Sequence, residues 1–161
     1  MVDLRVIDFT AGVSGAMCAK AMADLGADVV LVEPPQGSPT RRVAPFLDDE
    51  PGPEHSYRHL YFNANKRSIV LDQTREADRA RLRELTTTAD VILETAGPAA
   101  MGELGLGYDD LRPLNPGLIY VSITPFGIDG EWAAWKANDL VTAAAGGLLQ
   151  VTGEAEDPPA Q

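Results

Sequence analysis

The stretch 5–33 constrains the fold most strongly, because its pattern predicts a strand, a turn, a helix and a second strand. Residues 6–9 are rich in β-forming side chains, and residues 29–32 form an apolar run typical of a strand buried on both faces. Between them, apolar residues recur at helical spacing from Met17 to Leu25, just before a glycine. Such a βαβ unit joins parallel strands by a right-handed crossover and leaves a crevice at their carboxyl ends. The sequence therefore predicts a parallel sheet with a ligand crevice at that edge.

Two glycines, Gly12 and Gly15, supply the turn after the first strand. Glu33 closes the next strand about twenty residues further on, where dinucleotide-binding folds place a ribose-binding acid. The glycine pattern is G-x-x-G, however, and lacks the middle glycine that lets the backbone approach a pyrophosphate. We therefore favour a tight turn with close helix packing over an NAD site.

The composition describes an acidic chain with enough apolar residues for one core. The chain has 161 residues, 45% of them hydrophobic, and a formal net charge of -11. These values fit one compact α/β domain, and the excess of acid disfavours a broad surface for nucleic acid or anionic membrane. No signal peptide or long apolar span is evident, so we expect a soluble cytoplasmic protein. The single cysteine, Cys18, is expected to be a small buried hydrophobe rather than a catalytic thiol.

The composition changes in residues 34–59, which hold six prolines and both histidines. Prolines at this density preclude regular structure, so we expect a long loop laid over the strand ends. His55 and His59 are four residues apart, a spacing shared by metal-binding helices, but no third ligand follows in a matching context. We therefore expect solvent-facing loop histidines and no metal site.

The rest of the chain alternates strands with helices. The expected strands cover residues 68–71, 91–93 and 118–123, and the expected helices cover residues 74–87, 98–104, 108–114 and 139–150. Five strands alternating with helices predict a doubly wound parallel α/β sheet. Trp132 and Trp135, before the last helix, are open to two interpretations: packing residues or the lining of a cleft.

Two polar segments are candidate ligand contacts. Lys66 and Arg67 follow Asn63 and Asn65, and two cations beside two amides can hold phosphate oxygens. A solvated basic turn explains the same residues equally well. The turn 94–98 leads into a short helix, whose amino end is suited to an anion.

Three motifs occur here in a family-specific order: ADLGADVV-x-VEPP, then NKRS, then LNP-x-LIY. With the segments around them, they resemble the amino-terminal part of the family III (CaiB/BaiF type) CoA-transferases over essentially the whole chain. The resemblance implies that residues 1–161 are the amino-terminal part of a Rossmann-like large domain, incomplete here, which binds CoA rather than NAD. It also implies a second domain absent from this chain, and either a homodimer of interlocked chains or a complementary chain.

The resemblance implies an enzyme that moves CoA from an acyl-CoA to a carboxylic acid. Relatives use an aspartate nucleophile, which forms a mixed anhydride and then an aspartyl-CoA thioester. That aspartate is expected shortly after the stretch matching 156–161, so this chain alone is expected to be inactive. Some relatives racemise 2-methylacyl-CoA with a His-Asp pair where this chain has Asn138 and Asp139, and Asn138 cannot titrate. A third possibility is a non-catalytic CoA-binding or assembly module.

The resemblance also implies CoA contacts at the amino-terminal half of the chain. Val13 and Ser14 match the turn that approaches the thioester region of CoA. Arg41 and Arg42 match a loop that carries a cation for the nucleotide phosphates. Leu71 matches an apolar residue that lies against the adenine.

Further implied contacts follow along the chain. Lys66 and Arg67 match the NKRS motif and are taken as CoA-binding. Thr95 and Ala96 occupy CoA-contact positions, although many relatives have Asn-Phe there and a cation in place of Glu103. Lys136 and Asp139 match a cleft-lining segment, in which Asp139 is an auxiliary catalytic acid. The resemblance implies no metal, and CoA is a substrate.

Overall fold

The computed structural model describes residues 1–153. The chain divides into two compact units, Met1–Ile123 and Thr124–Gln161. Within the described residues, no helix is both long enough and apolar enough to cross a membrane.

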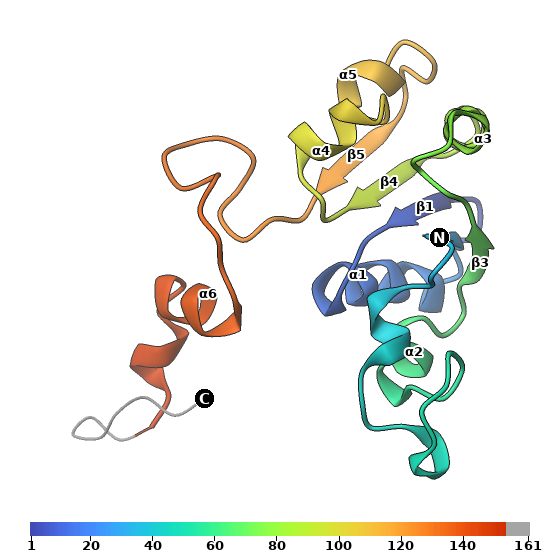
Figure 1. Cartoon of the computed structure of the whole chain (residues 1–161). Coiled ribbons are helices and arrows are strands. Elements are labelled where there is room, and N and C mark those ends of the chain that lie inside the picture. Colours follow the sequence, from blue (N-terminus) through green and yellow to red (C-terminus); the bar gives the residue numbers. More distant parts are fainter. Residues whose placement is uncertain (154–161) are drawn as a thin grey trace. The chain divides into compact units, whose positions relative to one another are not determined.

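The first unit is built on one five-stranded parallel sheet (Figure 1). Its strands are β1 (Arg5–Phe9), β2 (Asp28–Glu33), β3 (Arg67–Val70), β4 (Val91–Glu94) and β5 (Ile119–Ser122). The strand order is β3-β2-β1-β4-β5, and Ile7 at the centre pairs with Val30 on one side and Ile92 on the other. The chain therefore winds outward from β1 to β3, returns to β4 and ends at β5. This arrangement confirms the predicted doubly wound α/β sheet.

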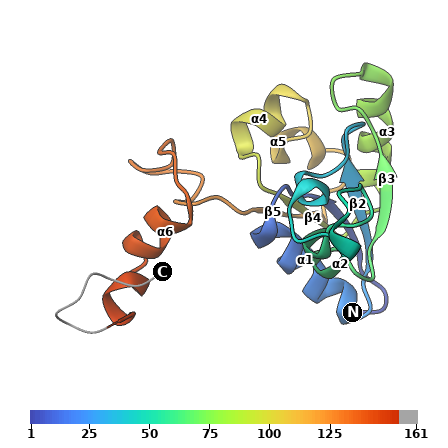
Figure 2. The same ribbon diagram turned by 60° about the horizontal axis from the view of Figure 1, so that its bottom comes forward.

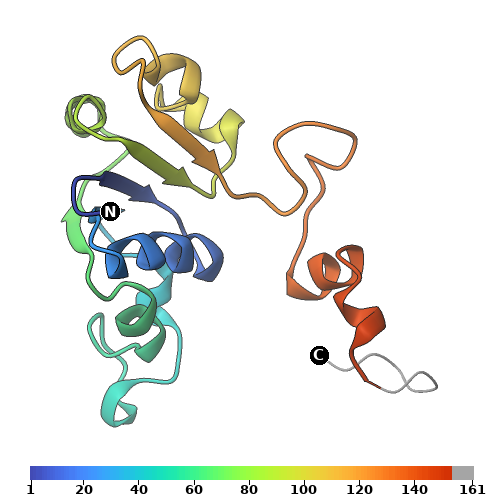
Figure 3. The same cartoon turned by 180° about the vertical axis from the view of Figure 1, so that it is seen from behind.

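Helices cover both faces of the sheet. They are α1 (Val13–Asp24), α2 (Tyr57–Phe62), α3 (Glu76–Thr86), α4 (Pro98–Glu103) and α5 (Tyr108–Leu111). In Figure 2, α1 and α2 lie below the strands and α3, α4 and α5 lie above them. Figure 3 shows α1 beneath β1 from behind. The crossover through α1 runs from β1 to β2 and the crossover through α3 runs the opposite way along the sheet, from β3 to β4. Right-handed crossovers in opposite directions place their helices on opposite faces.

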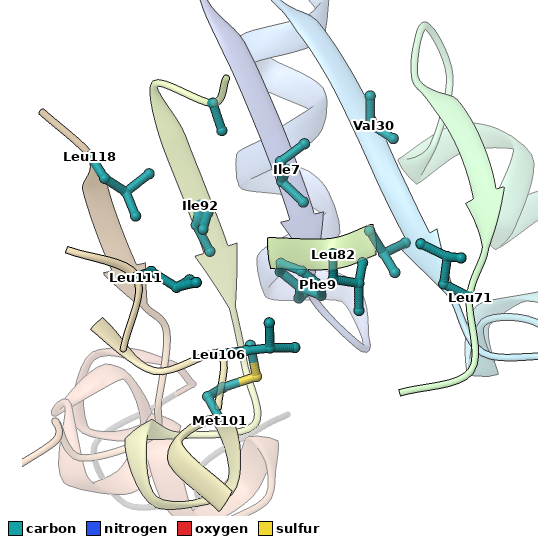
Figure 4. Close-up of a cluster of buried hydrophobic side chains, with 12 residues drawn as sticks. Ile7, Phe9, Val30, Leu71, Leu82, Ile92, Met101, Leu106, Leu111 and Leu118 are labelled. Carbon is teal, nitrogen blue, oxygen red and sulfur yellow. The ribbon is translucent and has the colours of Figure 1, made fainter. Parts of the chain in front are cut away.

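Each face of the sheet has its own hydrophobic cluster. The face under α3, α4 and α5 is the larger, and Figure 4 shows Leu82 of α3 close to Ile7 and Phe9 of β1. The buried residues of this first cluster are Ile7, Phe9, Val30, Val32, Leu71, Leu82, Ala89, Ile92, Met101, Leu106, Leu111 and Leu118. The second cluster lies under α1 and contains Val6, Ala19, Ala23, Ala27, Val29, Val91 and Leu93. A hydrophobic cluster therefore covers each face of the central strands, as strands buried on both faces require.

The buried face of α1 differs from the expected apolar stripe. Met17 is 45% exposed and Leu25 is 62% exposed, whereas the buried positions are small residues such as Ala19 and Ala23. Small side chains let the helix axis approach the sheet closely, so the larger side chains are left at the helix margins. Cys18 is half-buried beside the second cluster, rather than fully buried as expected.

The proline-rich segment after β2 is more ordered than expected. It contains two short 3-10 helices, η1 (Pro39–Arg42) and η2 (Leu47–Asp49), before α2. Proline fits the first turn of a helix, and Pro39 begins η1. Ser56 then caps α2, because its Oγ accepts a hydrogen bond from the backbone N–H of His59 at 3.3 Å. His59 is only 5% exposed, so the expectation of a solvent-facing histidine was wrong.

The second unit contains α6 (Asp139–Ala145) and the 3-10 helix η3 (Leu148–Val151). The expected helix 139–150 is interrupted because Gly147 adopts a left-handed conformation with φ of 77°. Trp132 and Trp135 stack on each other with ring centroids 5.4 Å apart, and more than half of each side chain remains exposed. The two tryptophans therefore pack against one another.

Candidate functional site

The topological switch point of the sheet lies between β1 and β4, where parallel α/β sheets open a ligand crevice at their carboxyl ends. The turns that leave β1 and β4 meet there. The N–H of Ala11 donates to Thr95 Oγ1 at 2.8 Å, and that hydroxyl donates to the carbonyl of Ala11 at 3.3 Å. Val13, Ser14 and Ala96 are exposed beside this contact. The structure thus brings four of the predicted site residues, Val13, Ser14, Thr95 and Ala96, to one edge of the sheet.

The two glycines of the β1–α1 turn have different roles. Gly12 has φ of 97°, a backbone conformation that favours glycine, and an added Cβ would meet no other atom within 4 Å. Gly15 packs against the end of β1, where an added Cβ would lie 2.3 Å from Thr10 Cβ. These two observations confirm the interpretation of G-x-x-G as a tight turn with close helix packing.

The amino end of α1 faces the same edge. The first N–H groups of a helix have no partners within the helix. Among residues 1–153, no acceptor takes a hydrogen bond from the backbone N–H of Val13 or Ser14. These two donors are therefore available to a ligand at the carboxyl edge.

Lys66 is not presented to a ligand, because its ammonium is buried. The side chain is 1% exposed and forms an ion pair with the fully buried Asp8, with Nζ 2.9 Å from Oδ2. Nζ also donates to the carbonyl of Ala16 and to Asn63 Oδ1, each at 2.9 Å. An ammonium has three N–H donors, so all three are used internally. The predicted phosphate contact of Lys66 is corrected to an internal ion pair.

Arg67 lies at the other end of its strand from the ligand edge. It begins β3 and forms a bidentate pair with Asp28 at the start of β2, with both carboxylate oxygens 2.6 Å from Nη2. A strand rises about 3.3 Å per residue, so the Cα of Val70, where β3 ends, is roughly 10 Å further along. Lys66 and Arg67 therefore do not form the phosphate site predicted from their adjacency.

Arg41 and Arg42 differ sharply in their surroundings. Arg41 forms a bidentate pair with the buried Glu33, with Nε 2.6 Å from Oε2 and Nη2 2.7 Å from Oε1. Its Nη1 donates to Glu54 Oε1 at 2.6 Å and to the carbonyl of Pro53 at 3.0 Å. Arg42 is exposed, and within residues 1–153 its side chain donates only to the carbonyl of Gln36, at 2.9 Å. Of the two predicted phosphate cations, Arg42 keeps more of its five guanidinium N–H donors free within the described part of the chain.

Glu33 is held as a carboxylate by its donors. The hydrogen bonds from Arg41, together with those from Ser68 Oγ and the N–H of Ser38, lower its pKa from 4.5 to about 2 despite burial. Its oxygens are engaged by protein groups, which agrees with the choice against a ribose-binding acid in an NAD site.

A cavity of about 600 Å³ opens beside the carboxyl ends of β2 and β3. Its lining residues are Glu33, Pro35, Gln36, Gly37, Arg41, Arg42, Phe46, Pro51, Gly52, Pro53, Glu54, Ser68 and Val70. Leu71, predicted to lie against an adenine, is instead 4% exposed and packs in the first hydrophobic cluster. Val70 is 59% exposed and lines the cavity. Side chains alternate between the two faces along a strand, so a buried Leu71 predicts that its neighbour Val70 faces the other way. This alternation could have indicated Val70 rather than Leu71 as the apolar residue beside the cavity.

A buried hydrogen-bond chain leads from this cavity to Lys66. Ser38 Oγ and Thr40 Oγ1 are 2.9 Å apart, and Thr40 Oγ1 is 2.9 Å from His59 Nδ1. Asn63 Oδ1 accepts from Lys66, so its amide nitrogen is the atom that faces His59 Nδ1, at 3.2 Å. His59 Nδ1 must then act as an acceptor, which requires a neutral ring protonated at Nε2. Burial, together with the nearby charge of Arg41, lowers the pKa of His59 below its ordinary 6.5.

Sequence reasoning missed Asp8, the buried partner of Lys66 beside the candidate site. It is fully buried in β1, and its Oδ1 accepts a hydrogen bond from the N–H of Thr10 at 2.9 Å. A carboxylate in the middle of the apolar strand RVIDF was the available signal, because buried charges are almost always paired.

The second unit holds the two remaining predicted site residues. Lys136 and Asp139 are both exposed, and Asp139 lies in the first turn of α6. Asn138 caps this helix, with its Oδ1 3.0 Å from the N–H of Val141. Within residues 1–153, no three His, Cys, Asp or Glu side chains lie together as a metal site would require.

Known proteins are similar to this chain in sequence and in fold. The sequence model of CoA-transferase family III matches residues 1–161. The chain is 42% identical, over 155 residues, to the succinyl-CoA:(R)-benzylsuccinate CoA-transferase subunit BbsE of Thauera aromatica, covering 96% of this chain and 38% of that protein. It is 39% identical, over 159 residues, to the formyl-CoA:oxalate CoA-transferase of Streptomyces avermitilis, covering 97% of this chain and 37% of that protein.

Solved structures agree with these sequence matches. A CaiB/BaiF family protein from Brucella suis superposes with a TM-score of 0.88 at 36% identity, over 98% of this chain and 42% of that chain. Rv3272 from Mycobacterium tuberculosis gives a TM-score of 0.83 at 37% identity, over 98% of this chain and 43% of that chain. The chain spans about two fifths of the length of the relatives that it matches. It belongs to CoA-transferase family III.

Proposed function

We propose that this chain supplies the CoA-binding amino-terminal part of a cytoplasmic CoA-transferase, which moves CoA between an acyl-CoA and a carboxylic acid. The observation that carries the proposal is the cavity of about 600 Å³, with the exposed cation of Arg42 in its lining, at the same sheet edge as the turn holding Val13 and Ser14. Strands lie about 4.8 Å apart, so roughly 10 Å separates β3 from β1 across this edge. A long ligand with an anionic nucleotide at one end and a thiol at the other suits that span.

In this proposal, the cavity takes the nucleotide. Arg42 donates to the phosphates with its free guanidinium N–H groups. The exposed side chain of Val70 and the half-buried ring of Phe46 offer apolar surface to the adenine. Leu71 supports the site from the core, and Arg41 holds the cavity wall rather than the ligand.

The β1–α1 turn takes the other end of CoA. The free N–H groups of Val13 and Ser14 are placed to donate to carbonyl oxygens of the pantetheine arm or of the thioester. Thr95 and Ala96, in the turn after β4, lie beside the β1–α1 turn and complete this part of the site. Binding energy from the nucleotide, far from the sulfur, then serves to hold the reacting thioester in place.

The chemistry implied by the family resemblance uses an aspartate carboxylate. Its attack on the acyl-CoA carbonyl expels the CoA thiolate and forms a mixed anhydride. The thiolate then attacks the aspartyl carbonyl and releases the donor acid, which leaves an aspartyl-CoA thioester for the acceptor acid. We place that aspartate in the part of the relatives that this chain does not cover. Asp139 and Lys136 remain proposed auxiliary groups at the exposed start of α6.

The named relatives suggest the substrate class and the assembly. Their names include succinyl-CoA:mesaconate, acetyl-CoA:oxalate and succinate–glutarate CoA-transferases, so we propose small dicarboxylic acids as donor or acceptor. The relative from Thauera aromatica is named as a subunit, which supports assembly with a second chain. A racemase is not favoured, because Asn138 caps α6 and cannot exchange a proton.

Calorimetric titration of the chain with CoA tests the proposal. Replacing Arg42 by alanine removes one charge-assisted phosphate contact and is expected to weaken CoA binding about tenfold. Arg58→Ala is the matched control, because Arg58 is an exposed arginine of α2 outside the cavity lining. Failure of the folded wild-type chain to bind CoA would refute the proposal, as would equal effects of the two substitutions.

A further inference from the structure

One buried ammonium connects both ends of the β1–α1 turn. Lys66 Nζ contacts Asp8 Oδ2 at 2.9 Å, and Asp8 in turn accepts a hydrogen bond from the N–H of Thr10. The same Nζ donates to the carbonyl of Ala16, in the first turn of α1, at 2.9 Å. The residues between Asp8 and Ala16 are therefore bracketed by a single side chain that comes from the segment before β3.

The ammonium is itself held in one position. Its third N–H donates to Asn63 Oδ1 at 2.9 Å, and Asn63 is the C-cap residue of α2. Asn63 is anchored in turn through its amide nitrogen, which is 3.2 Å from the carbonyl oxygen of His59. Lys66 thus joins β1, α1 and α2 with fixed directions, which a non-directional apolar contact would not impose.

Stability alone is a weak reason for this arrangement. Taking a lysine and an aspartate out of water is unfavourable for each ion, and replacing such a pair with apolar groups is often neutral or stabilising. The better-attested use of a buried polar pair is to specify one geometry. Here the geometry that it specifies is the position of α1 relative to β1, and hence that of the free N–H groups of Val13 and Ser14.

We propose that Lys66 is a positioning residue for CoA: it sets the turn that receives the thioester end, and it does not touch the ligand. The inference rests on the proposed function of this turn. The inference predicts different effects on the two ends of CoA. Lys66 contacts both ends of the turn, and it is absent from the lining of the cavity beside Arg42. Loss of Lys66 then weakens binding of the pantetheine and thiol end and spares binding of the nucleotide end.

The test compares CoA with adenosine 3′,5′-bisphosphate, which is its nucleotide portion alone, by calorimetric titration. The variant is Asp8→Asn/Lys66→Met, which removes both charges together and leaves an oxygen for the N–H of Thr10. The advantage of CoA is the ratio of the Kd of the bisphosphate to the Kd of CoA. In this variant, that ratio is expected to fall about tenfold, while the Kd of the bisphosphate stays within about twofold of wild type. Circular dichroism and a urea unfolding curve establish that the variant is folded.

Lys20→Met is the matched control, because Lys20 pairs with Asp24 on α1, away from the turn. It is expected to leave both affinities unchanged. The proposal is overturned if the double variant keeps the full advantage of CoA, or if it loses CoA and bisphosphate affinity in equal proportion, as a merely structural role requires. A wild-type chain that binds bisphosphate but gains nothing from the rest of CoA overturns it too. Binding of neither ligand refutes the proposed function itself.

Discussion

Replacing Gly15 by alanine tests the packing of α1 against the end of β1. An added Cβ would lie 2.3 Å from Thr10 Cβ, 2.4 Å from its Cγ2 and 2.7 Å from its Oγ1. Carbon atoms in contact are normally about 3.5–4.0 Å apart, so the helix or the strand must move by more than about 1 Å. Thr10 cannot turn away easily, because it is 6% exposed and β-branched side chains are restricted at χ1.

The expected cost follows from two opposing contributions. Alanine in a helix is favoured over glycine by about 1 kcal/mol. Overpacking a closely packed site costs about 1–3 kcal/mol, and more where backbone rather than a flexible side chain must move. Because the contacts with Thr10 are far shorter than normal, we expect an overpacking cost at the upper end of this range, about 3 kcal/mol, so that the free energy of unfolding falls by about 2 kcal/mol. For a chain of this size, that corresponds to a decrease in Tm of roughly 4–8 °C.

The assay is urea unfolding followed by circular dichroism, with Gly102→Ala as the matched control. Gly102 lies in α4, and a Cβ there would meet no other atom within 4 Å, so this substitution is expected to be neutral or stabilising. The double variant Thr10→Gly/Gly15→Ala removes the clash, so the two effects should be strongly non-additive. Equal stability of Gly15→Ala and Gly102→Ala would contradict the close packing of Gly15 against Thr10.

Three further measurements test the described charges and caps. The pKa of Glu33 is lowered from 4.5 to about 2 in the folded chain, so its contribution to stability is lost as pH falls from about 4.5 to about 2. Urea unfolding at several pH values should therefore show a smaller loss of stability with falling pH for Glu33→Gln than for wild type. The pKa of His59 is lowered, so its contribution to the free energy of unfolding is complete above pH 6.5 and declines below it. An NMR titration that gives His59 a pKa above 6.5 would contradict the neutral ring. Asn138→Ala removes the cap of α6 and should cost about 1 kcal/mol locally, seen as faster amide exchange at Val141.

The pattern of apolar residues along the sequence was sufficient to predict the parallel sheet. The apolar runs that became β1, β2 and β4 are buried on both faces, which a continuous apolar run predicts directly. α2 was missed because proline density dominated the interpretation of its neighbourhood, although Ser56 is a good N-cap. Likewise, the buried face of α1 depends on how closely the helix approaches the sheet, which helical spacing does not reveal.

The site residues were harder to predict, because their roles depend on distant partners. Lys66 and Arg67 are neighbours in sequence, yet one meets Asp8, 58 residues away, and the other meets Asp28, 39 residues away. Arg41 and Arg42 are separated in the same way, since only Arg41 meets Glu33. A cluster of cations in the sequence indicates where positive charge is available, whereas acids elsewhere in the sequence decide which cation stays free.

The clamp formed by Arg41 has a consequence for the thermodynamics of ligand binding. Its hydrogen bonds to Glu33, Pro53 and Glu54 fix the outer wall of the cavity to β2 without any ligand. The conformational entropy of this loop is therefore lost during folding and not during binding, so a nucleotide meets a preorganised surface. Arg41→Ala should then weaken nucleotide binding through a more unfavourable binding entropy, although Arg41 itself has few donors left to offer a phosphate.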